Sequence, residues 1–344
     1  MFDGHNDQLS KLHAAGGDPV ALFQDNPSAA IDAPRAVAGG FAGGLFAIWI
    51  PSPETDGPDY AAMAEEGFDV PLPAPVPYEP SISAALAQFS VLTALERGGA
   101  LKICRTAGEV RAAIDAGTLA AVAHMEGAEP IDEDLAALDV FHAAGVRSLG
   151  PVWSRPNRFG HGVPFRFPSS PDTGPGLTDL GQALVRRCNA LRIMVDVSHL
   201  NEAGFWDVAR ISDAPLVATH SNAHALCATA RNLTDKQLDA IAETKGMVGV
   251  NFATAFLRQD GRMLPHVPLE RVLQHLDHLI DRLGEDGVGF GSDYDGAVVP
   301  DAIEGVDGLP RLRQHMLDHG YGETLMRKLC FENWVNVLQR TIGT

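Results

Sequence analysis

Short apolar runs alternate with longer segments of helical periodicity along most of the chain. The apolar runs are rich in small and β-branched residues and span residues 1–5, 43–52, 119–127, 146–153, 193–199, 215–221, 246–252 and 288–296. The other segments repeat apolar residues at three- and four-residue intervals, as amphipathic helices do, and span residues 81–99, 134–145, 177–192, 202–212, 234–246 and 268–287. The pattern therefore predicts eight strands, most of them followed by a helix.

Alternation of strands and helices predicts a parallel sheet. Eight such units in a chain of 344 residues predict an α/β fold of the (β/α)₈ TIM-like barrel type, as one domain over residues 1–344. A doubly wound open sheet is the alternative. Its glycine-rich turn should follow a strand, whereas "GGFAGG" (39–44) precedes one. The proline-rich run at 68–81 is interpreted as a rigid loop before a helix.

Composition narrows the class of protein. The formal net charge of −18 argues against nucleic acid or an anionic membrane surface as a partner. No apolar stretch reaches 18 residues, so no membrane span is expected. Four widely spaced cysteines without a CxxC pair predict free thiols. The first candidate ligand stands at residue 5, which leaves no room for a leader, so we expect a cytoplasmic protein. A homodimer is left open.

Polar side chains gather at the carboxyl ends of the predicted strands. In a barrel these ends meet on one face, where active sites lie. A single polar residue at a strand end has an ordinary explanation, such as a capped turn or a hydrogen-bonded histidine. Six of them at the same end of successive strands favour a common site: His5, Asp7, Glu126, His199, His220 and Asp293.

These residue types are those of a metal-dependent hydrolase. Imidazole and carboxylate groups without thiolate suit Zn²⁺ or a similar divalent ion. Three histidines and two carboxylates are too many for one ion with an open position, and they fit two ions about 3.5–4 Å apart that share a carboxylate. His5 and Asp7 are two residues apart, so in an extended segment both side chains face the same side.

The motifs "DGHND", "MEG", "DVSH", "THSNAHALCATARNL" and "GFGSDYDG" follow one another in this order. Together they resemble the renal (membrane) dipeptidase family, peptidase family M19, a branch of the amidohydrolase superfamily. The resemblance covers nearly the whole chain. Many superfamily members begin with His-x-His and bridge their metals with a carbamylated lysine. This chain has His-x-Asp and no lysine at the carboxyl end of a strand, and Glu126 as the bridge, as in the dipeptidase branch, resolves both differences.

The resemblance implies a zinc-dependent metallo-dipeptidase with two Zn²⁺ per chain and a free dipeptide as substrate. His5 and Asp7 would hold one zinc, His199 and His220 the other, and Glu126 would bridge them. A hydroxide between the two cations would attack the peptide bond. Asp293 would take up its proton and pass it to the leaving amine.

The resemblance also implies a substrate-binding set. Arg231 matches the position that grips the free carboxylate of the substrate, and a guanidinium suits this bidentate task. Asn232, the next residue in "ARNL", belongs to the same set. The ordinary alternative for Arg231 is a surface residue paired with Asp235.

Two positions depart from the family pattern. Several members have a histidine that helps to polarise the scissile carbonyl where this chain has Trp153, which can donate only one N–H. His161, eight residues further on, is a candidate to replace it. Some members have a tyrosine where this chain has Ala253, which predicts a roomier pocket.

Two other classes of function share these features. An N-acyl amino acid hydrolase or a deaminase on the same scaffold would keep the metal residues but would not need Arg231 to face the cavity. A non-catalytic metal-binding protein would be expected to have lost a ligand or Asp293, and this chain has lost none of them.

Overall fold

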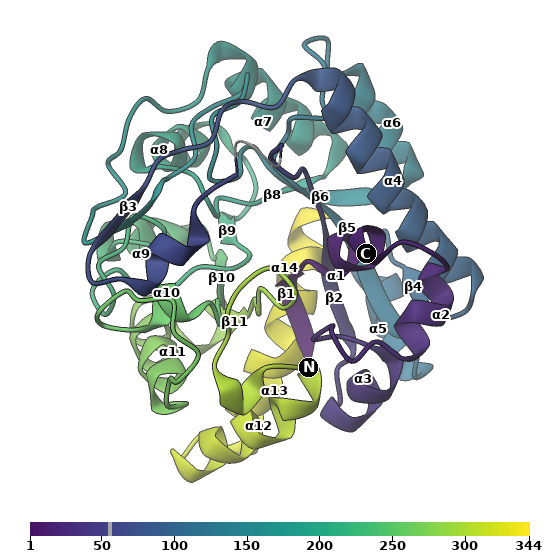
Figure 1. Cartoon of the computed structure of the whole chain (residues 1–344), viewed down its shortest axis with the longest axis vertical. Coiled ribbons are helices and arrows are strands. Elements are labelled where there is room, and N and C mark those ends of the chain that lie inside the picture. Colours follow the sequence, from purple (N-terminus) through teal and green to yellow (C-terminus); the bar gives the residue numbers. More distant parts are fainter. Residues whose placement is uncertain (54–56) are drawn as a thin grey trace.

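Eight parallel strands form a nearly closed barrel, with helices around the outside (Figure 1). The structure is a computed structural model that describes residues 1–53 and 57–344. The strands follow one another around the barrel in the order β8-β6-β5-β2-β1-β11-β10-β9. Their bounds are β1 Phe2–Asn6, β2 Gly43–Trp49, β5 Leu119–Glu126, β6 Val146–Gly150, β8 Met194–Val195, β9 Val217–Ala218, β10 Met247–Val250 and β11 Val288–Phe290.

The two ends of this series meet and close the barrel. A parallel bridge joins Asp196 to Val217, and the backbone N–H of Val197 donates to the carbonyl of Val217 at 2.8 Å. The order of strands around the barrel is thus their order along the chain. The predicted (β/α)₈ barrel is confirmed, and the doubly wound alternative is wrong.

Each predicted apolar run contains one barrel strand, but several strands are shorter than their run. The runs at 193–199 and 215–221 each contain a strand of only two residues, because the chain leaves the sheet after β8 and β9. One strand of the barrel sheet was not predicted. It is β4, Leu101–Ile103, which pairs with β5 outside the main order.

Helices cover the barrel wall. The six predicted helical segments correspond to α4 Tyr78–Arg97, α6 Ala136–Ala144, α7 Asp179–Leu191, α8 Glu202–Ile211, α9 Asp235–Glu243 and α11 Glu270–Leu283. The remaining α-helices of the described residues are α1 Gln8–Ala15, α2 Pro19–Gln24, α3 Ala33–Gly39, α5 Ala107–Asp115, α10 Thr254–Leu257, α12 Leu309–Asp318, α13 Glu323–Arg327 and α14 Asn333–Thr341. Short 3₁₀ helices are η1 Tyr60–Ala64, η2 Glu285–Gly287, η3 Asp301–Ile303 and η4 Val306–Gly308, and a π-helical turn, η5, spans Lys328–Glu332. Among residues 1–53 and 57–344, no helix is both long and apolar enough to cross a membrane.

Local sequence explains where these helices begin. The side chains of Thr178 and Asn201 accept hydrogen bonds from Gly181 and Gly204 at the starts of α7 and α8. Thr234 and Gln237 form a capping box at the start of α9. Such caps satisfy backbone N–H groups that the first helical turn leaves without partners.

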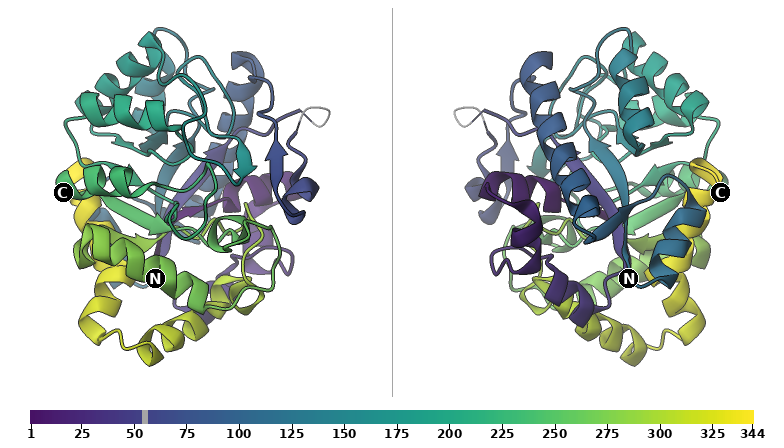
Figure 2. Two further views of the ribbon diagram at one scale, coloured as in Figure 1. Left: turned by 90° about the vertical axis from the view of Figure 1, so that its left-hand side faces the viewer. Right: turned by 90° about the vertical axis from the view of Figure 1, so that its right-hand side faces the viewer.

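The prediction of a loop over 68–81 was wrong at both ends of the run, because helix α4 already begins at Tyr78 and a strand lies at the start. Residues Phe68–Val70 form strand β3, which pairs with β7, Phe165–Phe167, as an antiparallel ribbon. Figure 2 shows β3 at the edge of the molecule, outside the barrel. Phe68 and Val70 are buried while Asp69 is exposed, an alternation of only three residues. So short an alternation is too weak a signal to predict a strand.

Trp334 of α14 packs against the barrel strands. Its indole N–H donates to the carbonyl of Phe290 at 2.9 Å. A Cβ atom added at Gly4 would lie 2.3 Å from the indole, and one added at Gly289 would lie 2.8 Å from it. Glycines in β1 and β11 are therefore required for this close approach. The four cysteines are free thiols, as predicted.

Candidate active site

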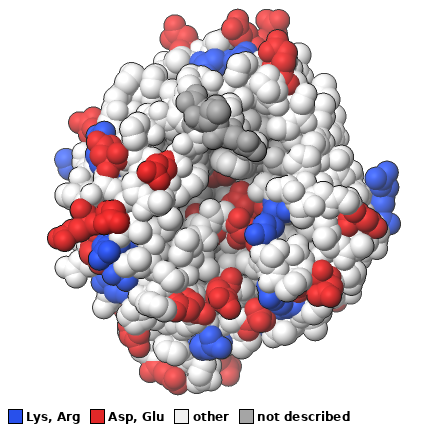
Figure 3. Space-filling view, in the orientation of Figure 1, with Lys and Arg blue, Asp and Glu red and all other residues white. Residues whose placement is uncertain are grey.

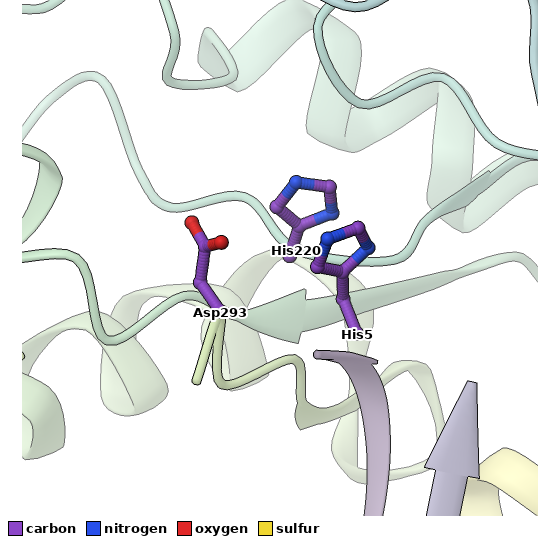
Figure 4. Close-up of side chains that lie close together, drawn as sticks. All are labelled: His5, His220 and Asp293. Atoms are coloured by element: carbon purple, nitrogen blue, oxygen red, sulfur yellow. The ribbon is translucent and has the colours of Figure 1, made fainter. Parts of the chain in front are cut away.

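Six side chains converge at the carboxyl ends of the barrel strands. They come from β1 and the residue after it, from the end of β5, and from the loops after β8, β9 and β11. Figure 4 shows three of them, His5, His220 and Asp293, reaching into the same space from β1 and from the loops after β9 and β11. The structure thus brings together all of the predicted metal and acid–base residues: His5, Asp7, Glu126, His199, His220 and Asp293.

Glu126 lies between two groups of potential ligands. Its Oε1 is 3.0 Å from Nε2 of His199 and 3.4 Å from Nε2 of His220. Its Oε2 is 3.6 Å from Nε2 of His5, which is in turn 3.4 Å from Oδ2 of Asp7. One carboxylate therefore reaches both groups, one oxygen to each, which is the arrangement a bridging ligand requires.

The histidines are oriented to bind cations. Nε2 of His199 and Nε2 of His220 face each other at 3.1 Å. Nδ1 of His199 is 2.9 Å from the hydroxyl of Ser154. The Thr219 hydroxyl donates to Asp196 at 2.6 Å and so accepts from Nδ1–H of His220 at 2.7 Å. This leaves the Nε2 lone pair of His220 directed into the site, as for a metal ligand.

The surroundings of His5 are a second test of whether these residues fit a metal ion. Neither of its buried ring nitrogens has a hydrogen-bond partner among the described residues. A buried polar atom without a partner costs about 1–3 kcal/mol. A cation at Nε2 would remove that cost, so the donor set fits divalent metal.

The electrostatics of the site also favour a cation. Burial raises the pKa of Glu126 well above its usual value, and the charges of Asp7 and Asp293 raise it further. Burial raises the pKa of Asp7 to about 7. Burial also lowers the pKa of both His199 and His220 well below the usual value, which favours the neutral imidazole that a metal ligand requires. Crowded carboxylates repel one another, and bound divalent ions would compensate for that repulsion.

Two of these residues have unusual backbone conformations. His199 has φ 66° and Asp293 has φ 63°, in the left-handed region that residues other than glycine seldom adopt. The backbone N–H of Asp293 donates to the carbonyl of His5 at 3.0 Å, and Asn251 donates its side-chain amide to Asp293 at 2.9 Å. The scaffold thus holds the Asp293 carboxylate in one orientation. Strain of this kind concentrates at functional sites.

A cavity of about 430 Å³ opens beside these residues. Figure 3 shows acidic side chains inside a hollow near the centre of this face. The polar part of the lining includes Asp7, Glu126, His199 and Asp293. The apolar part, which we call the apolar wall, consists of Trp49, Tyr60, Met63, Trp153, Phe165, Ala253, Ala255, Phe256, Met263, Ala297 and Val298.

Comparison with known proteins assigns this chain to a family. A family model described as membrane dipeptidase (peptidase family M19) matches residues 1–342. The chain belongs to this family. The resemblance inferred from the five sequence motifs is therefore confirmed, over nearly the whole length of the chain.

Among solved structures, dipeptidase AC, a metallo peptidase of family M19, is 55% identical with a TM-score of 0.97, over 100% of this chain and 99% of that one. A metallo peptidase from Rhodobacter sphaeroides, liganded with a phosphinate mimic of the dipeptide L-Ala-D-Ala, is 55% identical with a TM-score of 0.96. The match covers 99% of this chain and 98% of that one. An uncharacterized protein in the pqqA 5′ region of Klebsiella pneumoniae is 49% identical over 73% of this chain and 94% of its own.

In this member of family M19, Arg231 is buried next to His220, one of the candidate metal ligands. It is 3% exposed, and it donates to the Ser221 hydroxyl and to the backbone carbonyl of His220, both at 2.8 Å. Its Nε has no partner among the described residues, and its guanidinium lies 5.7 Å from the ring centre of Phe256. Asp235 is bound by His278 instead, at 2.8 Å. The alternative of a surface pair with Asp235 is therefore wrong.

The other three predicted substrate-binding residues differ in position. Trp153 lines the cavity, 6.0 Å from the ring of His199. Asn232 donates to the backbone carbonyls of Cys227 and Phe256, and so supports the loop behind the apolar wall. The structure does not bring His161 to the cavity, because its ring lies beside the Gly176 carbonyl at 3.5 Å. His161 therefore does not replace the family histidine.

Sequence reasoning missed most of the apolar wall. Tyr60, Met63, Phe165 and Met263 lie in short or irregular segments, where hydrophobic periodicity gives no signal. One signal in the sequence could have indicated the apolar wall, namely the concentration of aromatic and methionine residues outside the predicted strands and helices.

A second missed feature is a buried ion pair behind Trp153. Nε and Nη2 of Arg155 donate to Oε1 of Glu129 at 3.1 and 2.9 Å, and Nη2 also donates to the carbonyl of Ile50 at 2.9 Å. Nη1 donates to Ser52 at 3.0 Å. The guanidinium lies 5.4 Å from the Trp153 ring. Arg155 thus joins the loops that follow β2, β5 and β6, all at the rim of the cavity.

Replacing Arg155 by methionine should lower the free energy of unfolding by about 3–5 kcal/mol, because Glu129 would keep a buried charge without a partner. Denaturant unfolding measures this change. The matched control is Arg187→Met, which removes an exposed ion pair with Asp139 and should lower the free energy of unfolding by less than about 1 kcal/mol. Equal effects of the two variants would contradict the role given to the buried pair.

Proposed function

We propose that this M19 chain is a zinc-dependent dipeptidase that hydrolyses free dipeptides with two zinc ions per chain. The observation that carries the proposal is the position of Glu126, whose two oxygens reach the two groups of candidate ligands beside the cavity. The dipeptide mimic bound by the Rhodobacter sphaeroides relative, which is 55% identical to this chain, supports the substrate class.

The residues present fit the metal pair. His5 and Asp7 would hold one ion, His199 and His220 the other, and Glu126 both. When bound, two such ions lower the pKa of water and polarise the scissile carbonyl.

The chain's own residues carry the remaining steps. Asp293 takes a proton from the attacking water and delivers it to the leaving amine, acting first as a base and then as an acid. Burial raises the pKa of Asp293, which suits a group that must hold the proton between these two steps. Arg231 pairs with the free carboxylate of the substrate, and so limits the cavity to one residue beyond the scissile bond.

A substrate screen of the zinc-loaded protein tests this proposal. Dipeptides varied in side chain and chirality at both positions should be hydrolysed, and their N-acylated counterparts should not. If N-acyl amino acids or non-peptide amides are turned over as fast as free dipeptides, the N-acyl amino acid hydrolase becomes the better function. Release of ammonia from amino-substituted rings would favour the deaminase.

Metal analysis tests the binuclear site separately. The purified protein should contain close to two equivalents of zinc per chain. Glu126→Gln should lower the affinity of both ions together, because one carboxylate serves both. Glu133→Gln, a change at an exposed residue, is the control and should leave the zinc content close to two equivalents per chain. One equivalent that stays constant under zinc supplementation would contradict the binuclear site.

A further inference from the structure

Arg231 does not itself line the cavity, but one residue of the apolar wall, Phe256, lies next to it. The Arg231 guanidinium is 5.7 Å from the ring centre of Phe256, and this ring is stacked on that of Phe165 at 6.1 Å. Trp153 meets Phe165 edge-on at 5.7 Å. A row of aromatic rings thus leads from the guanidinium along the cavity.

This position determines which part of a substrate meets the wall. In a dipeptide, the Cα atom that carries the free carboxylate also carries the side chain of the second residue. If Arg231 holds that carboxylate, the second side chain is next to Phe256 and Phe165. Ala253 and Ala255 line the cavity in the same packed cluster as Phe165 and Phe256, and their small side chains leave space for it.

Hydrogen bonds to two backbone carbonyls hold this part of the cavity together before any substrate binds. The N–H of Met263 donates to the carbonyl of Met63 at 2.7 Å, and Nε of Arg262 donates to the carbonyl of Ala64 at 2.7 Å. These two bonds attach η1 to the loop after α10. A preformed pocket binds its ligand without the cost of ordering a loop, and the two methionines adapt to side chains of different shape.

The charges of the lining exclude one class of side chain. Its titratable groups are Asp7, Tyr60, Glu126, His199, Asp293 and Asp295, and among the described residues no lysine or arginine lines it. An acidic side chain placed against the apolar wall, away from Arg231 and the candidate metal ligands, would therefore lose its water without gaining a cation to pair with. Large apolar side chains gain instead, because they bury their surface against the wall.

We propose that the enzyme selects free dipeptides whose carboxyl-terminal residue has a large apolar side chain. The inference rests on the proposed function and adds the class of second residue, with Phe165, Phe256 and Met263 as the residues that determine it. The space left by Ala253 permits side chains as large as leucine or phenylalanine.

A series of dipeptides with alanine first tests the inference. With leucine, methionine or phenylalanine second, kcat/KM should exceed that of the glycine counterpart by about 10- to 200-fold, as a hydrophobic pocket discriminates. With aspartate second, kcat/KM should fall below the glycine value. Both enantiomers of each second residue are measured, so that chirality does not hide a preference for size.

Filling the pocket should abolish the preference. Ala253→Phe should lower kcat/KM for the leucine and phenylalanine substrates about 10-fold or more, while the glycine substrate changes much less. The matched control is Ala143→Phe, which adds the same side chain at an exposed position of α6 and should leave the series unchanged. If Ala253→Phe does not fold, Met263→Ala, which removes part of the wall, should reduce the same ratio.

Binding measured without turnover gives an independent result. Free phenylalanine and leucine, as products, should inhibit the unmutated enzyme at concentrations about tenfold or more below those of glycine. Equal rates and equal inhibition across the series would overturn the inference while leaving the dipeptidase function intact. Absence of hydrolysis for every free dipeptide would overturn the proposed function itself.

Discussion

Replacing Asp293 by asparagine is expected to lower kcat by about 10²–10⁴-fold, the range for loss of a general acid–base group, while both metal ions remain bound. Asparagine is nearly the same size and keeps an oxygen that can accept the hydrogen bond from Asn251. It cannot take up a proton from water or return one to the leaving amine. Steady-state kinetics and metal analysis on the same preparation separate these two properties.

Asp301→Asn is the matched control for this change. Asp301 is on the surface, where its carboxylate pairs with His266, so its loss should leave kcat unchanged. Should Asp293→Asn instead lose zinc while the remaining loaded fraction turns over normally, Asp293 is a ligand and not the proton carrier. The closeness of potential ligand atoms of His5, His220 and Asp293 makes that outcome a real alternative.

Arg231→Met is expected to lower kcat/KM for free dipeptides about 30-fold to several thousand-fold, equivalent to about 2–5 kcal/mol. A buried guanidinium that pairs with the substrate carboxylate contributes this much because water does not compete with it. Dipeptide amides lack the negative charge, so the unmutated enzyme should hydrolyse them more slowly than free dipeptides by a similar factor. In the variant, free dipeptides should lose most of this advantage over the amides.

Arg187→Met, which removes an exposed guanidinium, controls for the general effect of losing a positive charge. A variant that slows free dipeptides and amides by the same factor would show that Arg231 acts only by supporting His220 and Ser221. In that case the carboxylate is bound elsewhere, and the limit on substrate length needs another cause.

The barrel was predictable because each strand is buried on both faces. Such strands are continuous apolar runs, and eight of them between helical segments leave few alternatives. The strands β8 and β9 were found for this reason although each has only two ladder residues. The ribbon of β3 and β7 was not found, since its two short strands are almost a hundred positions apart and pair only in the folded chain.

The cluster of candidate metal ligands was predictable for a different reason. Histidine and carboxylate side chains are rare at buried strand ends, so Glu126 or His220 is visible against an apolar run. The apolar wall has no such contrast, because Phe165 or Met263 looks like any core residue. The pair of Glu129 and Arg155 was missed because nothing in a sequence shows which charges are buried together.

The positions of the tryptophans give the protein a built-in optical signal. Trp49 and Trp153 line the cavity with their rings 5.3 Å apart, whereas Trp334 is fully buried against the barrel. Trp206 lies on α8 and donates to Glu202 at 3.3 Å. Any ligand that displaces water from the cavity changes the surroundings of the first two indoles and leaves those of the other two unchanged. Intrinsic fluorescence can therefore follow occupancy in the unlabelled protein, against a constant background from Trp206 and Trp334.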